Sequence, residues 1–67
     1  MVHLTTSYYD QEPETEDFSS LDEAMEAYHD SCDQRDDLGQ SFGDVAQFRV
    51  WRLHAGKKTT IASRGYP

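Results

Sequence analysis

The segment Ser20 to Asp37, SLDEAMEAYHDSCDQRDD, predicts an amphipathic helix around which the rest of the fold is arranged. Ser20 and Glu23 have the spacing of a capping box, in which each side chain accepts a hydrogen bond from the other residue's backbone N–H group. Gly39 can adopt the left-handed conformation that ends a helix, so we expect the helix to end near Leu38. Apolar residues recur at the period of a helix and predict one buried stripe, made of Leu21, Ala24, Met25, Tyr28 and Cys32.

The opposite side of this helix carries a row of acidic side chains. The carboxylate row consists of Glu23, Glu26, Asp30, Asp33 and Asp37, with Asp22 and Asp36 beside it. Its ends are 14 residues apart, so at about 1.5 Å per residue the row is about 21 Å long. Like charges three or four residues apart repel one another, so local helix stability does not account for the row.

Charge is divided unevenly along the 67 residues. All thirteen acidic residues lie before residue 45, where Arg35 is the only base, whereas residues 45–67 contain five bases and no acid. The formal net charge of −7 disfavours direct binding to nucleic acid or anionic lipid, and it favours a basic protein partner. A chain of this length is expected to form one domain, residues 1–67, whose thin core leaves no room for a deep substrate cavity.

The single cysteine also bears on where the protein acts. One cysteine excludes an intramolecular disulfide, and its place on the apolar stripe favours a reducing compartment. No apolar run approaches the ~18 residues of a transmembrane helix, and the N-terminus lacks a signal-peptide pattern. We therefore expect a soluble, monomeric protein of the cytoplasm with no membrane partner.

Two segments precede the helix. Val2 to Tyr9, VHLTTSYY, alternates and is rich in β-branched and aromatic residues, so it predicts a first strand. Asp10 to Asp17, DQEPETED, has no apolar side chain apart from Pro13, and it predicts an extended surface loop. This loop could extend the negative face of the helix, or it could be a solvated connection.

After the helix, Gln40 to Asp44 predicts a turn-rich connection with Phe42 over one edge of the core. Val45 to His54 predicts a strand whose alternation is mixed, and a bulge between Val50 and Trp51 would reconcile its two apolar sets. Without a bulge, Trp51 lies on the outer face.

A hairpin completes the chain. Ala55 to Lys58 supplies a glycine turn, and Thr59 to Tyr66 returns as an antiparallel strand. The expected order is β-α-β-β, a two-layer α+β domain with one helix packed on a three-stranded antiparallel sheet. The other face of the sheet would be open.

The acidic, histidine and cysteine residues do not have the arrangement that a catalytic site or a metal site requires. The carboxylates are expected on convex, solvated surfaces, where nothing pushes their pKa values apart, so we predict no enzymatic activity. His29 and Cys32 are spaced to meet one metal ion, but no second pair supports them, and a buried thiol beside a half-exposed imidazole is the simpler interpretation. No phosphate-binding loop is present, so no cofactor is expected.

The carboxylate row has two interpretations, a solvated helix surface or a functional anionic surface. Charges at intervals of ~5–6 Å, the spacing of neighbours on a helix, imitate a run of backbone phosphates. We therefore expect an inhibitor that binds the basic, nucleic-acid-binding surface of a partner protein. The predicted contact residues are Asp22, Glu23, Glu26, Asp30, Asp33, Asp36 and Asp37, assisted by Glu14, Glu16 and Asp17.

In size, charge and layout the chain resembles the small, acidic, phage-encoded anti-CRISPR proteins, several of which are DNA mimics. The resemblance rests on residues 18–37, FSSLDEAMEAYHDSCDQRDD, followed by the hairpin of residues 47–66, QFRVWRLHAGKKTTIASRGY. It implies a CRISPR surveillance complex as the partner and the cytoplasm of the host cell as the location. These proteins share no common motif, so the resemblance assigns no residue, and the basic hairpin departs from pure mimicry.

Two alternative functions stay open. The first is a nucleic-acid-binding module that uses the basic hairpin, and its residues would be Arg49, Arg52, Lys57, Lys58 and Trp51. The second is a small accessory subunit whose exposed sheet face pairs with a larger complex, the acids serving only solubility.

Overall fold

The computed structural model describes residues 1–39 and 44–66 of the chain. The predicted connection through Phe42 lies outside the described residues, apart from Asp44. The prediction of an α+β fold is confirmed, with one helix and one antiparallel sheet. In chain order the elements are β1 (Val2–Tyr8), β2 (Glu14–Phe18), α1 (Leu21–Leu38), β3 (Val45–His54) and β4 (Lys57–Gly65).

The acidic segment Asp10 to Asp17, predicted as a loop, contains most of a strand, so that prediction is wrong. β2 pairs with β1 in antiparallel register. Alternation along the strand separates its charges, because Glu14 and Glu16 lie on one face while Thr15 and Asp17 lie on the other. Charged side chains are common on edge strands, where they prevent pairing with other chains.

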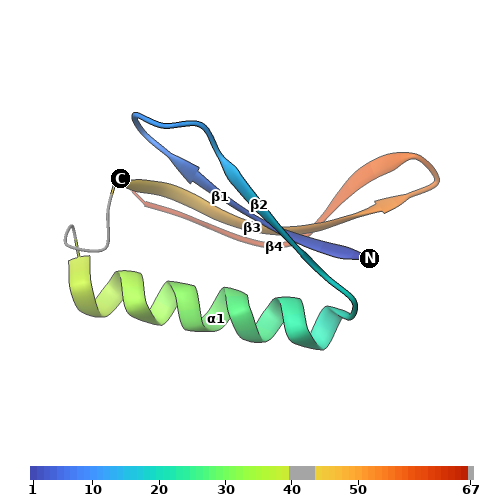
Figure 1. The fold of residues 1–67 in the computed structure, drawn as a ribbon, viewed down its shortest axis with the longest axis horizontal. Helices are drawn as coiled ribbons and strands as arrows, with labels where there is room; N and C mark the ends of the chain where they lie inside the picture. The colour runs from blue at the N-terminus through green and yellow to red at the C-terminus, as the bar shows by residue number, and fades with distance from the viewer. Residues whose placement is uncertain (40–43, 67) are drawn as a thin grey trace.

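The sheet therefore has four strands, in the order β2-β1-β3-β4, rather than the three expected. β2 is the additional strand, and it forms one edge of the sheet beside β1. Figure 1 shows α1 packed along one face of the sheet. The opposite face, called the open face below, has no second layer over it among the described residues, so the predicted two-layer arrangement is confirmed.

The core lies between α1 and the two central strands. Leu21 is 38% exposed, so its predicted place on the buried stripe is wrong. Leu21 is the first residue of α1, at the end where the β3–β4 hairpin twists away from the helix (Figure 1). The buried residues are Val2, Leu4, Ala24, Tyr28, Cys32, Val45, Phe48 and Val50.

The predicted irregularity at Val50 and Trp51 is present, but the extra residue belongs to the neighbouring strand. Val50 lies opposite Ala62 and Trp51 opposite Thr60, so Ile61 of β4 is the bulged residue. Alternation within β3 therefore continues through this point. Trp51 consequently faces the open side of the sheet.

A second irregularity explains why Val45 is buried together with Phe48. The register between β1 and β3 shifts between Ser7 and Tyr8, where Ser7 pairs with Gln47 and Tyr8 with Val45. The extra residue in β3 moves Val45 onto the core side, where it is 1% exposed.

The β3–β4 hairpin closes through two residues with positive φ angles. Ala55 has φ 53° and Gly56 has φ 79°, which is the backbone of a type I′ turn. The twist of this turn matches that of the flanking strands. The tip of the hairpin, with Lys57 and Lys58 beside the turn, lies away from α1 (Figure 1).

Candidate functional site

The local sequence at the start of α1 fixes the orientation of the acidic face. Ser20 is the N-cap, and its hydroxyl accepts a hydrogen bond from the backbone N–H of Glu23 at 3.3 Å. The Glu23 carboxylate accepts a hydrogen bond from the hydroxyl of Ser19 at 3.3 Å. Half of the predicted capping box is thus confirmed, while the Glu23 side chain reaches back to Ser19 rather than to the backbone of Ser20.

At the other end of α1 the backbone turns at Gly39. Its φ of 58° lies in the region that favours glycine, and its N–H donates to the carbonyl of Arg35. The helix therefore ends where the sequence predicts, and its whole length is available to display side chains.

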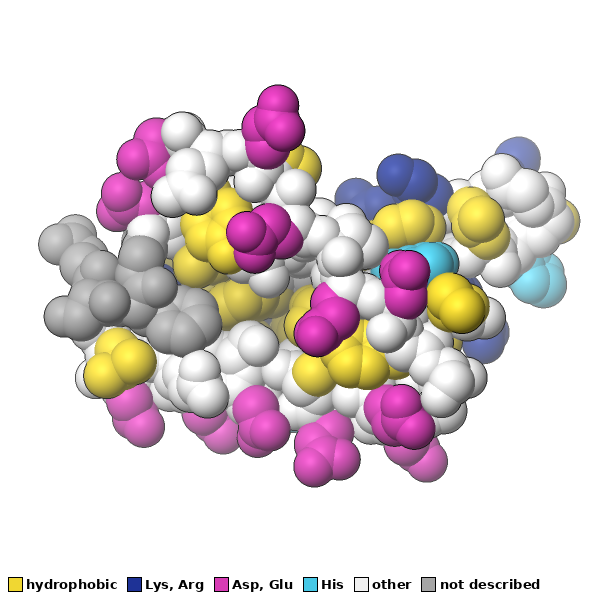
Figure 2. Space-filling view, viewed as in Figure 1, with side chains coloured by type: hydrophobic (Ala, Val, Ile, Leu, Met, Phe, Trp, Pro, Cys, Tyr) yellow, Lys and Arg dark blue, Asp and Glu magenta, His cyan; other side chains and the backbone are white. Residues whose placement is uncertain are grey.

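The carboxylate row faces solvent along the full length of α1. All five of its members and the neighbouring Asp22 are exposed, and Figure 2 shows acidic side chains spaced along the helix side of the molecule. In the described part of the chain, no ion pair joins any of these six carboxylates to a cationic side chain. Their charge is therefore directed outward, into solvent.

Asp36 differs from the rest of the predicted contact residues. It lies on the flank of α1 nearest β4. Its Oδ1 accepts a hydrogen bond from Nη2 of Arg64 at 3.1 Å, and its Oδ2 forms an ion pair with Nη1 of Arg64 at 3.0 Å. The carboxylate raises the pKa of the Arg64 guanidinium above its ordinary value. Asp36 is thus partly neutralised within the molecule, which weakens its case as a contact for an external cation.

The three acids of β2 do not form one extension of the helix face, contrary to one of the two possibilities that the sequence left open. Glu14 and Glu16 project toward α1, and Asp17 projects to the open face, where it accepts a hydrogen bond from Nδ1 of His3 at 2.6 Å. Strand alternation imposes this division.

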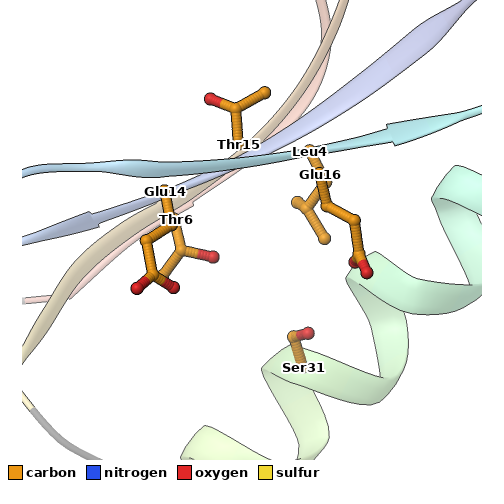
Figure 3. Close-up of a pocket in the computed structure, with 6 residues that line it drawn as sticks. All are labelled: Leu4, Thr6, Glu14, Thr15, Glu16 and Ser31. Atoms are coloured by element: carbon orange, nitrogen blue, oxygen red, sulfur yellow. The ribbon is translucent and has the colours of Figure 1, made fainter.

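A cleft of about 440 Å³ separates β1 and β2 from α1. Figure 3 shows Glu14 and Glu16 on the strand side and Ser31 on the helix side. The hydroxyl of Tyr8 donates to Glu14 at 3.3 Å, and burial followed by the charge of Glu14 raises the pKa of Tyr8. The chemistry of the cleft suits hydrogen-bond donors and cations.

The open face of the sheet carries a polar and aromatic cluster, and of its members the sequence pattern placed only Trp51 on the outer face. Trp51 donates its indole N–H to the hydroxyl of Thr5 at 2.8 Å, and Thr5 in turn bonds with Thr15 at 2.9 Å. The ring of His3 lies against Trp51, with centroids 4.4 Å apart. The alternation of His3 and Thr5 with Val2 and Leu4 in β1 was the signal that could have placed these residues on this face.

Cys32 and His29 do not share an environment. Cys32 is free and 5% exposed within the core, whereas His29 is exposed. Within residues 1–39 and 44–66, no group of three or more His, Cys, Asp or Glu side chains is arranged to hold a metal ion. Over the same residues, α1 is too polar to cross a membrane.

Comparisons with protein-family models, with curated proteins and with solved structures found no match. The similarity to anti-CRISPR proteins therefore stays a prediction.

Proposed function

We propose that this chain is a non-enzymatic inhibitor that binds, through the outer face of α1, the basic surface with which a partner protein holds nucleic acid. One observation carries the proposal: six carboxylates along α1 are exposed, and none has a cationic partner among the described residues. The cations of the chain lie elsewhere, mainly on β3 and β4.

The row is costly to the molecule that carries it. Glu26 and Asp30 are four residues apart and Asp30 and Asp33 are three apart, and each such pair of like charges destabilises a helix by about 0.2–0.5 kcal/mol. A basic partner converts this repulsion into attraction. The unfavourable arrangement is therefore consistent with an interaction surface, since a solvated helix would be more stable with mixed charges.

The spacing of the charges favours a nucleic-acid-binding partner over a general basic protein. Neighbouring carboxylates on one face of a helix lie ~5–6 Å apart, and lysines and arginines placed to meet successive phosphates can meet them too. Inhibition would be steric and electrostatic, because the same cations cannot pair with phosphate while they pair with α1. A CRISPR surveillance complex in the cytoplasm of a host cell is a partner of this kind.

Charge reversal on α1 tests the proposal. The variant Glu26→Lys/Asp30→Lys/Asp33→Lys is expected to lose the partner in affinity capture from cells that contain nucleic-acid-binding machinery, because three contacts become repulsive. Circular dichroism would establish that the variant is folded.

The matched control reverses three exposed acids outside α1, Asp10→Lys/Glu12→Lys/Asp44→Lys, and changes the net charge equally. This control is expected to retain the partner. Equal retention by both folded variants, or equal loss, would contradict a specific role for α1.

A further inference from the structure

We infer that the open face of the sheet is a binding surface for single-stranded nucleic acid, separate from the acidic face of α1. All four strands contribute to it, and Figure 1 shows that α1 leaves this face uncovered. The inference goes beyond the proposed function and departs from the expectation that the net charge sets against direct nucleic-acid binding. It rests on a preorganised aromatic pair, on the cations beside that pair, and on the distance from the acids of α1.

The aromatic pair is Trp51 and His3, called the aromatic platform below. Their centroids are 4.4 Å apart and their planes are inclined by 31°. Thr5 fixes the indole through its N–H, and Asp17 fixes the imidazole through Nδ1. Both rings are only part-buried, and they are held in place before any ligand arrives. Such rings on an exposed sheet are stacking surfaces for unpaired bases.

Two cations accompany the aromatic platform. Nζ of Lys58 lies 4.6 Å from the centroid of the Trp51 ring, and Cζ of Arg49 lies 5.9 Å from it. Their register positions place both on the open face, since Lys58 pairs with Leu53 and Arg49 with Thr5. Both lie over the face of the Trp51 ring as cation–π partners. A base that stacks on the aromatic platform would therefore have these cations close by, where they can meet the phosphates that flank it.

The acidic side chains of the chain lie mostly away from the open face, so they do not directly repel a nucleic acid bound there. Asp17 is the one acidic residue whose strand position places it on the open face among the described residues, and it already bonds to His3. The carboxylate row is exposed on α1, which packs on the opposite face of the sheet, and Figure 2 shows acidic side chains along that helix side. Layers of packed secondary structure are separated by about 10 Å, and charges further apart than ~8 Å are screened at physiological salt. The net charge therefore does not govern binding at the open face.

An acidic polypeptide would satisfy the cations but would leave the aromatic platform unused. Unpaired bases use both, which is why the observations favour nucleic acid. Duplex DNA is less suitable, since its bases are already stacked within the helix.

The test uses the full chain and an oligothymidine of about 12 nucleotides, within the site sizes of single-strand-binding domains. Trp51 is the only tryptophan, so its fluorescence reports directly on stacking. We expect the oligonucleotide to quench this fluorescence. An abasic strand of equal length, which keeps the phosphates, is expected to bind about tenfold or more weakly.

Matched double variants test the face that is used. The salt dependence of oligothymidine binding is measured as the slope of log association constant against log salt concentration, which is negative. Arg49→Ala/Lys58→Ala is expected to make this slope about 1.4 less steep, at about 0.7 per phosphate contact. Arg52→Ala/Lys57→Ala removes the same charge from the other side of the hairpin, according to the register, and is expected to leave the slope unchanged.

No quenching by oligothymidine, equal binding of the abasic strand or of polyglutamate, or equal effects of the two double variants would overturn the inference. The α1 variant Glu26→Lys/Asp30→Lys/Asp33→Lys is expected to bind oligothymidine at least as well as the parent. Failure at this surface is therefore distinguishable from failure of the proposed function.

Discussion

Two tyrosine hydroxyls link the stability of this fold to pH in the alkaline range. Burial raises the pKa of Tyr28 and of Tyr66 above the ordinary value of 10.0, and the neighbouring Cys32 thiol raises both further. The folded state therefore holds the phenol protons more tightly than the unfolded chain does. The stability that these groups contribute is complete below pH 10 and is lost as the pH rises beyond it.

Denaturant unfolding on either side of pH 10 measures this effect. The free energy of unfolding is expected to fall above pH 10. In the variant Tyr28→Phe it is expected to fall less steeply, because the Tyr28 hydroxyl no longer contributes a proton that the folded state holds more tightly than the unfolded state. Comparison of the two proteins near pH 7 separates the loss of the hydroxyl itself from the pH dependence. Identical slopes above pH 10 would show that Tyr28 does not contribute.

At the scale of the element, α1 combines a well-capped backbone with a charge pattern that opposes it. Replacing Glu26, Asp30 and Asp33 by their amides removes the six repulsive pairs that these residues form with acids three or four positions away along α1. At about 0.2–0.5 kcal/mol per pair, the triple variant is expected to be about 1.2–3 kcal/mol more stable than the parent. Thermal unfolding at low salt checks this. The same variant is expected to bind the partner more weakly. An unchanged or lowered stability would mean that the row carries no intrinsic cost.

The elements also show why some of the fold could be predicted. α1 and β3 were predictable because capping residues, apolar spacing and β-branched residues act locally. β2 was missed because its acids look unfavourable for a strand until they are paired across to β1. There His3 lies opposite Asp17 and Thr5 opposite Thr15, and each pair is hydrogen-bonded.

At the scale of the whole molecule, the division of charge along the sequence becomes a division between surfaces. Figure 2 shows acidic side chains along the helix side and around the β1–β2 end, with the cations gathered toward the β3–β4 hairpin. Sequence alone predicted the acidic face of α1, because it follows from helical spacing. It could not show that Arg64 bonds to Asp36, 28 residues away, since that contact depends on how α1 lies across β4.

Competition between this chain and DNA tests the central claim most directly. The measurement takes the partner retained by affinity capture and titrates it with a DNA duplex in the presence of the Arg49→Ala/Lys58→Ala variant, whose own affinity for nucleic acid is reduced. If the carboxylate row occupies the partner's nucleic-acid site, binding of the chain and of the duplex is mutually exclusive. A stable ternary complex of partner, duplex and chain would contradict the account.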